Sequence, residues 1–195
     1  MKKIMFNDRF GLTEAVLNGS KTQTRRAFTP FSQKLIEDCI LKGYILGYKD
    51  GILMATDSGY KLMADDFRQA YKVGEVVAVA QSYDSIVDKH GTVYAEAYDV
   101  PDRGAGYFNK MFVCADLMPH QIRITNVRIE RLQDISEEDC IKEGAGLYGP
   151  NENGFSRYNA VTAKKTFPVL IDYISGKGTW DSNPFVWVYD FELIK

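Results

Sequence analysis

The sequence predicts an α+β fold in which helices cover a small β-barrel or a strongly curled sheet. Two observations carry this prediction: apolar, strand-like runs occur at uneven spacing, and helical segments stand between them. A doubly wound parallel sheet fits poorly, because strands and helices do not alternate regularly and the chain has neither a GxGxxG run nor a P-loop. The length of 195 residues fits a single domain, 1–195, with insertions near 30–70 and 99–118.

Strands are expected where apolar and β-branched residues form short runs, at 3–6, 44–48, 52–54, 60–63, 76–80, 92–98, 122–132 and 185–194. The Asp50-Gly51 pair predicts a hairpin turn between the second and third of these runs. In 122–132 the alternation of apolar and charged residues slips by one position at Thr125-Asn126, which predicts a β-bulge.

Helices are expected at 13–17, 30–42, 137–143 and 159–174, from apolar residues at helical spacing and from their end signals. Thr29 and Pro30 form an N-cap and first-turn pair, and Ser136 caps a helix whose first turn is acidic. Pro168 is expected to kink the last helix. The glycine- and asparagine-rich stretch 145–157 is expected to be a loop.

Charge and cysteine content limit the ligands that the chain can take. The net charge of −2 gives no global attraction to nucleic acid, so any anion site must be a local patch. Cys39, Cys114 and Cys140 are scattered, and His90 and His120 are isolated from them and from each other. We therefore expect reduced thiols, no metal site and no cofactor.

The first residues give no sign of a targeting segment. Two lysines stand near the start, but the short apolar run behind them ends at Asn7-Asp8-Arg9. The pattern predicts neither a signal peptide nor a membrane span, and hence a cytoplasmic protein with no membrane partner.

The run Gly19–Arg26 concentrates the groups most suited to chemistry. The Thr24 hydroxyl is a nucleophile only if a base takes its proton, and Lys21 is a base only if burial lowers its pKa. Their spacing brings the two side chains together in a helical turn but directs them to opposite faces in an extended segment. Arg25 and Arg26 can bind phosphate or carboxylate in a bidentate manner. The alternative is a solvated basic loop whose arginines pair with acidic residues.

Glu143 lies in the last turn of the helix capped by Ser136, where the helix dipole is negative. Burial there would raise its pKa and suit it to donate a proton. An exposed glutamate beside Lys142 is the simpler interpretation of the same pattern.

Aromatic and amide side chains form a second group of candidates, at Tyr83, Trp180, Asn183 and Trp187. Aromatic rings beside amides can stack a nucleobase and bind its edge. They can equally be core residues of the closing strand.

Three separate segments resemble one family. Gly19-Ser20-Lys21-Thr22-Gln23-Thr24-Arg25-Arg26 resembles the GxKxxTxR signature of the ASCH domain, a member of the PUA-like superfamily. The segment 131–144 resembles the strand-helix element of phage-type and bacterial ASCH proteins, and 176–188 resembles their NPWVWV tail. In one departure, Ala80 and Gln81 stand where relatives of this size often carry a charged pair.

The resemblance implies a small PUA-like barrel of mixed or antiparallel strands, with peripheral helices and an inserted hairpin. It also implies a phage- or prophage-type bacterial protein that binds a nucleoside, a nucleotide or RNA. Small bacterial members hydrolyse N4-acetylcytidine, and their catalytic lysine, threonine and glutamate match Lys21, Thr24 and Glu143. The resemblance places Arg25 or Arg26 near the substrate. The alternatives are a non-catalytic RNA- or nucleotide-binding module and a phage accessory protein.

Overall fold

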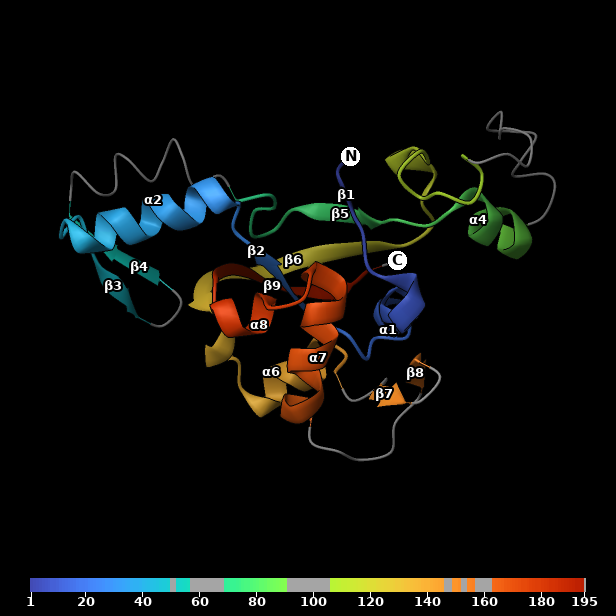
Figure 1. Ribbon diagram of the computed structural model, residues 1–195. Helices are drawn as coiled ribbons and strands as arrows, with labels where there is room; N and C mark the ends of the chain where they lie inside the picture. The colour runs from blue at the N-terminus through green and yellow to red at the C-terminus, as the bar shows by residue number, and fades with distance from the viewer. Residues whose placement is uncertain are drawn as a thin grey trace.

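The structure, a computed structural model, describes residues 1–49, 52–56, 69–90, 106–145, 149–151, 154–156 and 163–194. Its centre is a sheet of five strands, β1 Lys3–Ile4, β5 Val76–Val79, β6 Gln121–Arg131, β9 Phe185–Leu193 and β2 Gln23–Ala27, in that spatial order. The β1–β5 pair is parallel and the other pairs are antiparallel. The fold is therefore mixed α+β, as the sequence predicts (Figure 1).

The expected barrel is wrong for the described residues, because β1 and β2 remain the two edges of an open sheet. The strand β1 is only two residues long, since the chain turns at Asn7 into the short 3₁₀ helix Asp8–Phe10. Side chains bridge the gap instead of backbone pairing. The Arg26 guanidinium donates to the Met5 carbonyl and lies over the Phe6 ring, 5.9 Å from its centroid.

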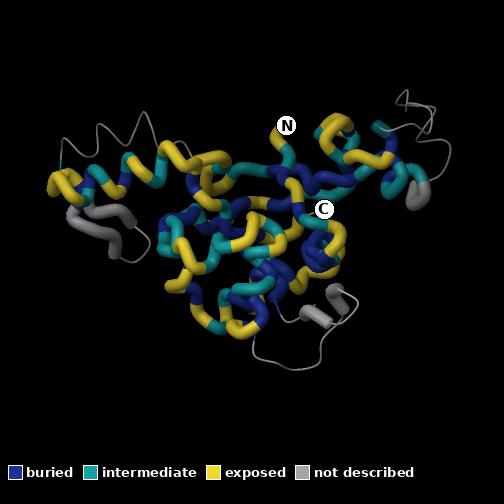
Figure 2. The backbone as a smooth tube through the Cα atoms, in the orientation of Figure 1, coloured by how far each residue is buried: buried dark blue, intermediate teal, exposed yellow. Residues whose placement is uncertain are grey.

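The helices are α1 Leu12–Leu17, α2 Pro30–Leu41, α4 Tyr83–His90, α6 Glu137–Lys142, α7 Ala163–Ser175 and α8 Thr179–Ser182, with further short 3₁₀ turns at Ala115–Leu117 and Leu132–Asp134. Helices α1, α6 and α7 gather on one side of the sheet (Figure 1). They bury Val16, Cys140 and Phe167 in the main core, which includes Val188 and Phe191 of β9. The buried segments follow the centre of the molecule in Figure 2.

Two smaller cores lie at the ends of the sheet. At one end, α2 and the hairpin of β3 Ile45–Lys49 and β4 Ile52–Ala55 extend away from it (Figure 1). Ile36 and Ile45 pack there with Phe185. At the other end, α4 buries Ile86 in a separate cluster with Ala78 and Ala80.

The predicted bulge is confirmed, and it changes which residues share a face of the sheet. The β6–β9 register pairs Ile124 with Phe191 but Asn126 with Asp190, so one residue of β6 is extra. Since side chains alternate along a strand, residues after the bulge face the opposite side from the one that unbroken pairing would give. Arg128 therefore lies on the same face as Arg25 of β2, since both pair with Val188 of β9, and Glu130, two residues further along β6, shares this face.

Most end signals are confirmed. Thr29 accepts from the Ser32 amide at the start of α2, and Ser136 accepts from the Asp139 amide at the start of α6. Pro168 lies inside α7, and the kink expected there stays a prediction. Among the described residues, no helix is long and apolar enough to cross a membrane.

Other local predictions were wrong or are not tested. The stretch 145–157 is not all loop, because β7 Gly149–Asn151 pairs with β8 Gly154–Ser156. Helices α4 and α8 were not predicted. The expected strands 60–63 and 92–98 lie outside the described residues, as does the Asp50-Gly51 turn.

Candidate active site

The basic run is a tight turn followed by an edge strand. Gly19 adopts a left-handed conformation, with φ of 77°, directly after α1. The Lys21 amide then donates to the Ala15 carbonyl and the Thr22 amide donates to the Lys142 carbonyl, which brings this turn against the end of α6. From Gln23 the chain pairs with β9. The position of Lys21 before the strand explains why it and Thr24 can line one cavity.

Lys21 is almost completely buried, with 2% of its surface exposed. Its ammonium nitrogen donates to the Gln23 carbonyl at 2.6 Å and to the Glu143 carbonyl at 2.7 Å. A third bond, also 2.7 Å, reaches Oε2 of the Glu143 carboxylate. Three acceptors match the three hydrogens of an ammonium group, so the resting geometry is that of a protonated lysine.

Burial lowers the pKa of Lys21, because removing a charge from water disfavours the ammonium form. The Glu143 carboxylate opposes this effect, while the charges of Arg26 and Arg25 add to it. The net direction brings the amine closer to the range in which it can accept a proton, as the sequence hypothesis requires.

Glu143 lies at the C-terminal end of α6 and is 6% exposed, so it is buried. It is not an isolated buried acid, however. Its Oε2 accepts from Lys21, and its Oε1 accepts from Nη1 of Arg25 at 3.2 Å. The alternative of an exposed glutamate beside Lys142 is wrong.

The side chains of Lys21, Thr24 and Glu143 line one cavity of about 90 Å³. Thr24 is 4% exposed, and within the described part of the chain its hydroxyl makes no hydrogen bond. The cavity therefore combines a hydroxyl without a partner and a buried, hydrogen-bonded lysine–glutamate pair. This arrangement can activate a hydroxyl nucleophile.

The two arginines have different environments. Arg25 is buried and forms ion pairs with Glu143, Glu130 and Asp139. Burial opposes its charge, but these carboxylates raise its pKa. Arg26 is half-buried, also lines the cavity, and forms no ion pair with any described residue. Arg26, whose Nη2 donates to the Met5 carbonyl, thus lacks a carboxylate partner among the described residues and can bind an acceptor on a ligand through its other N–H groups.

The ion pairs of Arg25 continue to Arg128, which lies on the same face of the sheet and shares the partners Glu130 and Asp139. Arg128 donates to Glu130 at 2.5 Å, to Asp190 at 2.5 Å and to Asp139 at 2.8 Å. Burial alone would raise the pKa of Asp139, but the hydrogen bonds and charges of Arg25 and Arg128 outweigh it and lower this pKa. The network holds α6, and with it Glu143, against the sheet.

The predicted aromatic and amide site residues do not line this cavity. Tyr83 stacks on Tyr107 in the core beside α4, with ring centroids 6.1 Å apart. Asn183 accepts from the Gln133 amide at 2.8 Å in a turn. Trp187 packs on Phe28, with ring centroids 5.1 Å apart.

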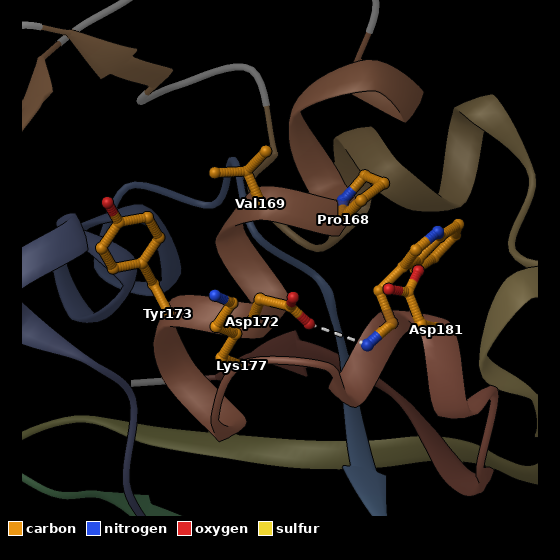
Figure 3. A pocket seen from close by; sticks show the side chains of 7 residues that line it. Pro168, Val169, Asp172, Tyr173, Lys177 and Asp181 are labelled. Carbon is orange, nitrogen blue, oxygen red and sulfur yellow. Dashed lines mark hydrogen bonds between the residues drawn. The ribbon is translucent and has the colours of Figure 1, made fainter.

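Trp180 lines a different pocket, a groove of about 570 Å³ formed by α7 and α8. Figure 3 shows side chains that line the groove, among them Asp172. The Trp180 amide donates to the Asp172 carboxylate at 2.8 Å. The groove and the Lys21 cavity share α7 but use different residues of it. The sequence candidates therefore divide into one cluster around Lys21 and four separate residues.

Sequence reasoning missed the apolar wall of the cavity. Phe6 lies beneath two cations, with the Lys21 nitrogen 5.7 Å from its ring centroid. Phe167, Leu170 and Ile174 of α7 also line the cavity. Their helical spacing was visible, but it is the same for any helix packed on a core.

No group of described residues could hold a metal ion. No protein-family model and no curated protein sequence matches the chain. The fold is weakly similar to the crystal structure of a protein from Enterococcus faecalis V583 assigned to the family DUF984. The similarity has a TM-score of 0.37 and 12% sequence identity, and it covers 94% of this chain and 66% of that one. This chain thus spans just under two thirds of that protein, and at this TM-score the similarity supports no statement about function.

Proposed function

We propose that the protein is an amidohydrolase that removes a small acyl group from a nucleoside such as N4-acetylcytidine. The observation that carries the proposal is the buried Lys21–Glu143 pair in one cavity with the Thr24 hydroxyl, which makes no hydrogen bond to any described residue. The same proposal includes membership of the ASCH family, with an open sheet in place of the PUA-like barrel.

In the proposed first step, Thr24 attacks the acyl carbonyl. The Lys21 ammonium passes a proton along its 2.7 Å hydrogen bond to Oε2 of Glu143, which leaves a neutral amine and a carboxylic acid. The amine then takes the hydroxyl proton as the Thr24 oxygen forms its bond to carbon. Arg26 donates to the carbonyl oxygen, where negative charge develops.

In the second step, the Glu143 acid gives its proton to the leaving nitrogen as the amide bond breaks. This step leaves an acyl ester on Thr24 and restores the Lys21–Glu143 ion pair. Water then attacks the ester, and its proton follows the same route through Lys21 and Glu143. Lys21 accepts the water proton after passing its own to Glu143, and Glu143 returns a proton to the Thr24 oxygen. Every proton is accounted for, and the released products are the amine and a carboxylic acid.

The cavity size limits what enters it. Pockets that enclose a whole drug-sized ligand measure about 300–1,000 Å³, whereas this cavity measures about 90 Å³. An acyl group is small enough for such a space and a nucleoside is not. The proposal therefore places the acyl group inside the cavity and the rest of the substrate outside it.

Replacing Thr24 with valine tests the proposal with little risk to the fold. Valine has nearly the same shape, and the lost hydroxyl has no hydrogen bond within the described part of the chain. We expect Thr24→Val to unfold at an unchanged temperature while kcat for N4-acetylcytidine falls by about 1,000-fold or more. Thr24→Ser keeps the nucleophile and is the matched control, expected to retain measurable turnover.

The measurements are cytidine release by chromatography and thermal unfolding of each variant. Full activity in Thr24→Val would exclude a nucleophilic threonine. Absence of turnover by the wild type over a series of acylated nucleosides, at high enzyme concentration, would exclude the enzyme. A non-catalytic binding module that uses Arg26 is the second candidate, since this cation lines the cavity without an ion pair to any described residue. That module predicts nucleotide affinity that Thr24→Val does not change and Arg26→Gln weakens.

A further inference from the structure

A third pocket lies on another side of α1, and its described lining residues include none that line the Lys21 cavity. Its volume is about 240 Å³, and its lining comes from the α1 region and from the turn between β5 and α4. The residues that matter for its chemistry are Asp8, Glu14, Leu17, Gln81, Ser82 and Ser85. We propose that this pocket binds a small organic cation, an ammonium or amidinium group on a short apolar stem.

Gln81 is the first observation that points to a ligand. Only 4% of the residue is exposed, yet no donor among the described residues reaches its side-chain oxygen Oε1. A buried carbonyl oxygen without a hydrogen bond destabilises the folded protein, because it has lost its water partners and gained no donor. The backbone amide of Gln81 donates to the Met118 sulfur at 3.2 Å, which fixes the residue's place at the pocket wall. Rotation about the last side-chain torsion, which is soft, turns this oxygen toward a bound N–H group.

The charges around the pocket determine the sign of the ligand. Asp8 is already satisfied, because Oδ1 accepts from Thr13 at 2.5 Å and Oδ2 pairs with Lys110 at 2.8 Å. Glu14 is exposed and pairs with no described residue. Within the described part of the chain, no lysine or arginine lines the pocket. The free charge at its rim is therefore negative.

The rest of the lining fits the same ligand. Ser82 and Ser85 share a hydrogen bond of 2.9 Å between their hydroxyls, and Ser82 also accepts from the Ser85 amide at 3.2 Å. The hydroxyl oxygens keep lone pairs that can accept from a ligand. Leu17 supplies an apolar surface for a short carbon stem. Acceptors and one free carboxylate thus surround the pocket, and this combination favours N–H donors and disfavours anions.

Three probes of equal length and different charge test the proposal: butylammonium, butanol and butyrate. Binding is measured by titration of the amide resonances of residues 8–17 and 81–85. Only butylammonium is expected to bind, with a dissociation constant on the order of 1 mM. Equal binding of butanol or butyrate would overturn the proposal, as would no binding of butylammonium up to about 50 mM.

Two variants locate the site. Gln81→Leu removes the unpaired oxygen, so we expect about tenfold weaker butylammonium binding together with an equal or higher unfolding temperature. Glu14→Gln is expected to weaken binding by about threefold to tenfold. Glu138→Gln changes the charge equally at an exposed position of α6 and is expected to have no effect. Unchanged affinity in both site variants, or a much lower unfolding temperature of Gln81→Leu, would contradict the assignment.

Discussion

Lys21→Met is expected to lower the free energy of unfolding by about 3–5 kcal/mol, the usual effect of removing one partner of a buried ion pair. The substitution keeps the apolar stem but leaves the carbonyls of Gln23 and Glu143 without their donor. It also leaves the Glu143 carboxylate with Arg25 as its remaining ion-pair partner. Turnover is expected to disappear as well. Urea unfolding at pH 7 measures the stability change.

Two further variants show whether the loss of stability comes from the buried Lys21–Glu143 pair or from the loss of any lysine. Lys2→Met breaks the half-exposed pair with Glu75 and is expected to cost about 1 kcal/mol or less. The double variant Lys21→Met/Glu143→Met removes both desolvated charges, so its loss should be smaller than the sum of the two single losses. A Lys21→Met protein as stable as the wild type would contradict the buried pair.

The pH dependence gives an independent check on Lys21. Its folded pKa lies below the unfolded value, so between the two values the unfolded chain binds more protons. Wild-type stability relative to Lys21→Met should therefore increase as the pH rises toward about 10. A difference that stays constant over the alkaline range would show that Lys21 titrates normally.

Arg25→Met is the second substitution with a large expected effect, again about 3–5 kcal/mol at pH 7. Arg25 is the common partner of Glu143, Glu130 and Asp139, and without it these carboxylates face one another with less compensation. Arg123→Met is the matched control. It breaks an exposed cross-strand pair with Glu192, and we expect a loss of about 1 kcal/mol or less.

Acid should reduce the effect of Arg25→Met. The pKa of Asp139 is lowered in the folded protein, so its contribution is present above the unfolded pKa and is lost as the pH falls through the folded pKa. The difference between wild type and Arg25→Met should therefore be largest near neutral pH and shrink below about pH 4. A difference independent of pH would mean that Arg25 stabilises the fold through packing alone.

Local structure could be predicted where the sequence carries its own signal. Thr29, Ser136 and the slip at Thr125 each act within a few residues, and all three predictions are confirmed. The open sheet could not be predicted in this way. Its edges depend on where β1 ends and on the Arg26–Met5 contact between distant segments.

The candidate site was predictable only in part. Lys21 and Glu143 are separated by 122 positions in the sequence. The local pattern is equally typical of a solvated basic loop around Lys21 and of an exposed glutamate at position 143. The family resemblance brought them together. The aromatic candidates show the opposite problem, because stacking platforms and core residues have the same composition. Trp187 and Tyr83 pack in cores, while Trp180 lines a separate groove.

The bulge in β6 makes an added residue there more damaging than a substitution. Thr125 is exposed, so most side chains should be acceptable at that position. Deleting Thr125 would remove the bulge and keep the pairs that follow it, because Asn126 would then stand directly after Ile124 and opposite Asp190. Inserting one residue beside it, with the bulge still one residue wide, would instead exchange the two faces of everything that follows in the strand. Val127 would then pair with Val188 beside Arg25, and Arg128 would pair with Trp187. Natural variation in this strand should therefore include many substitutions at position 125 and almost no insertions.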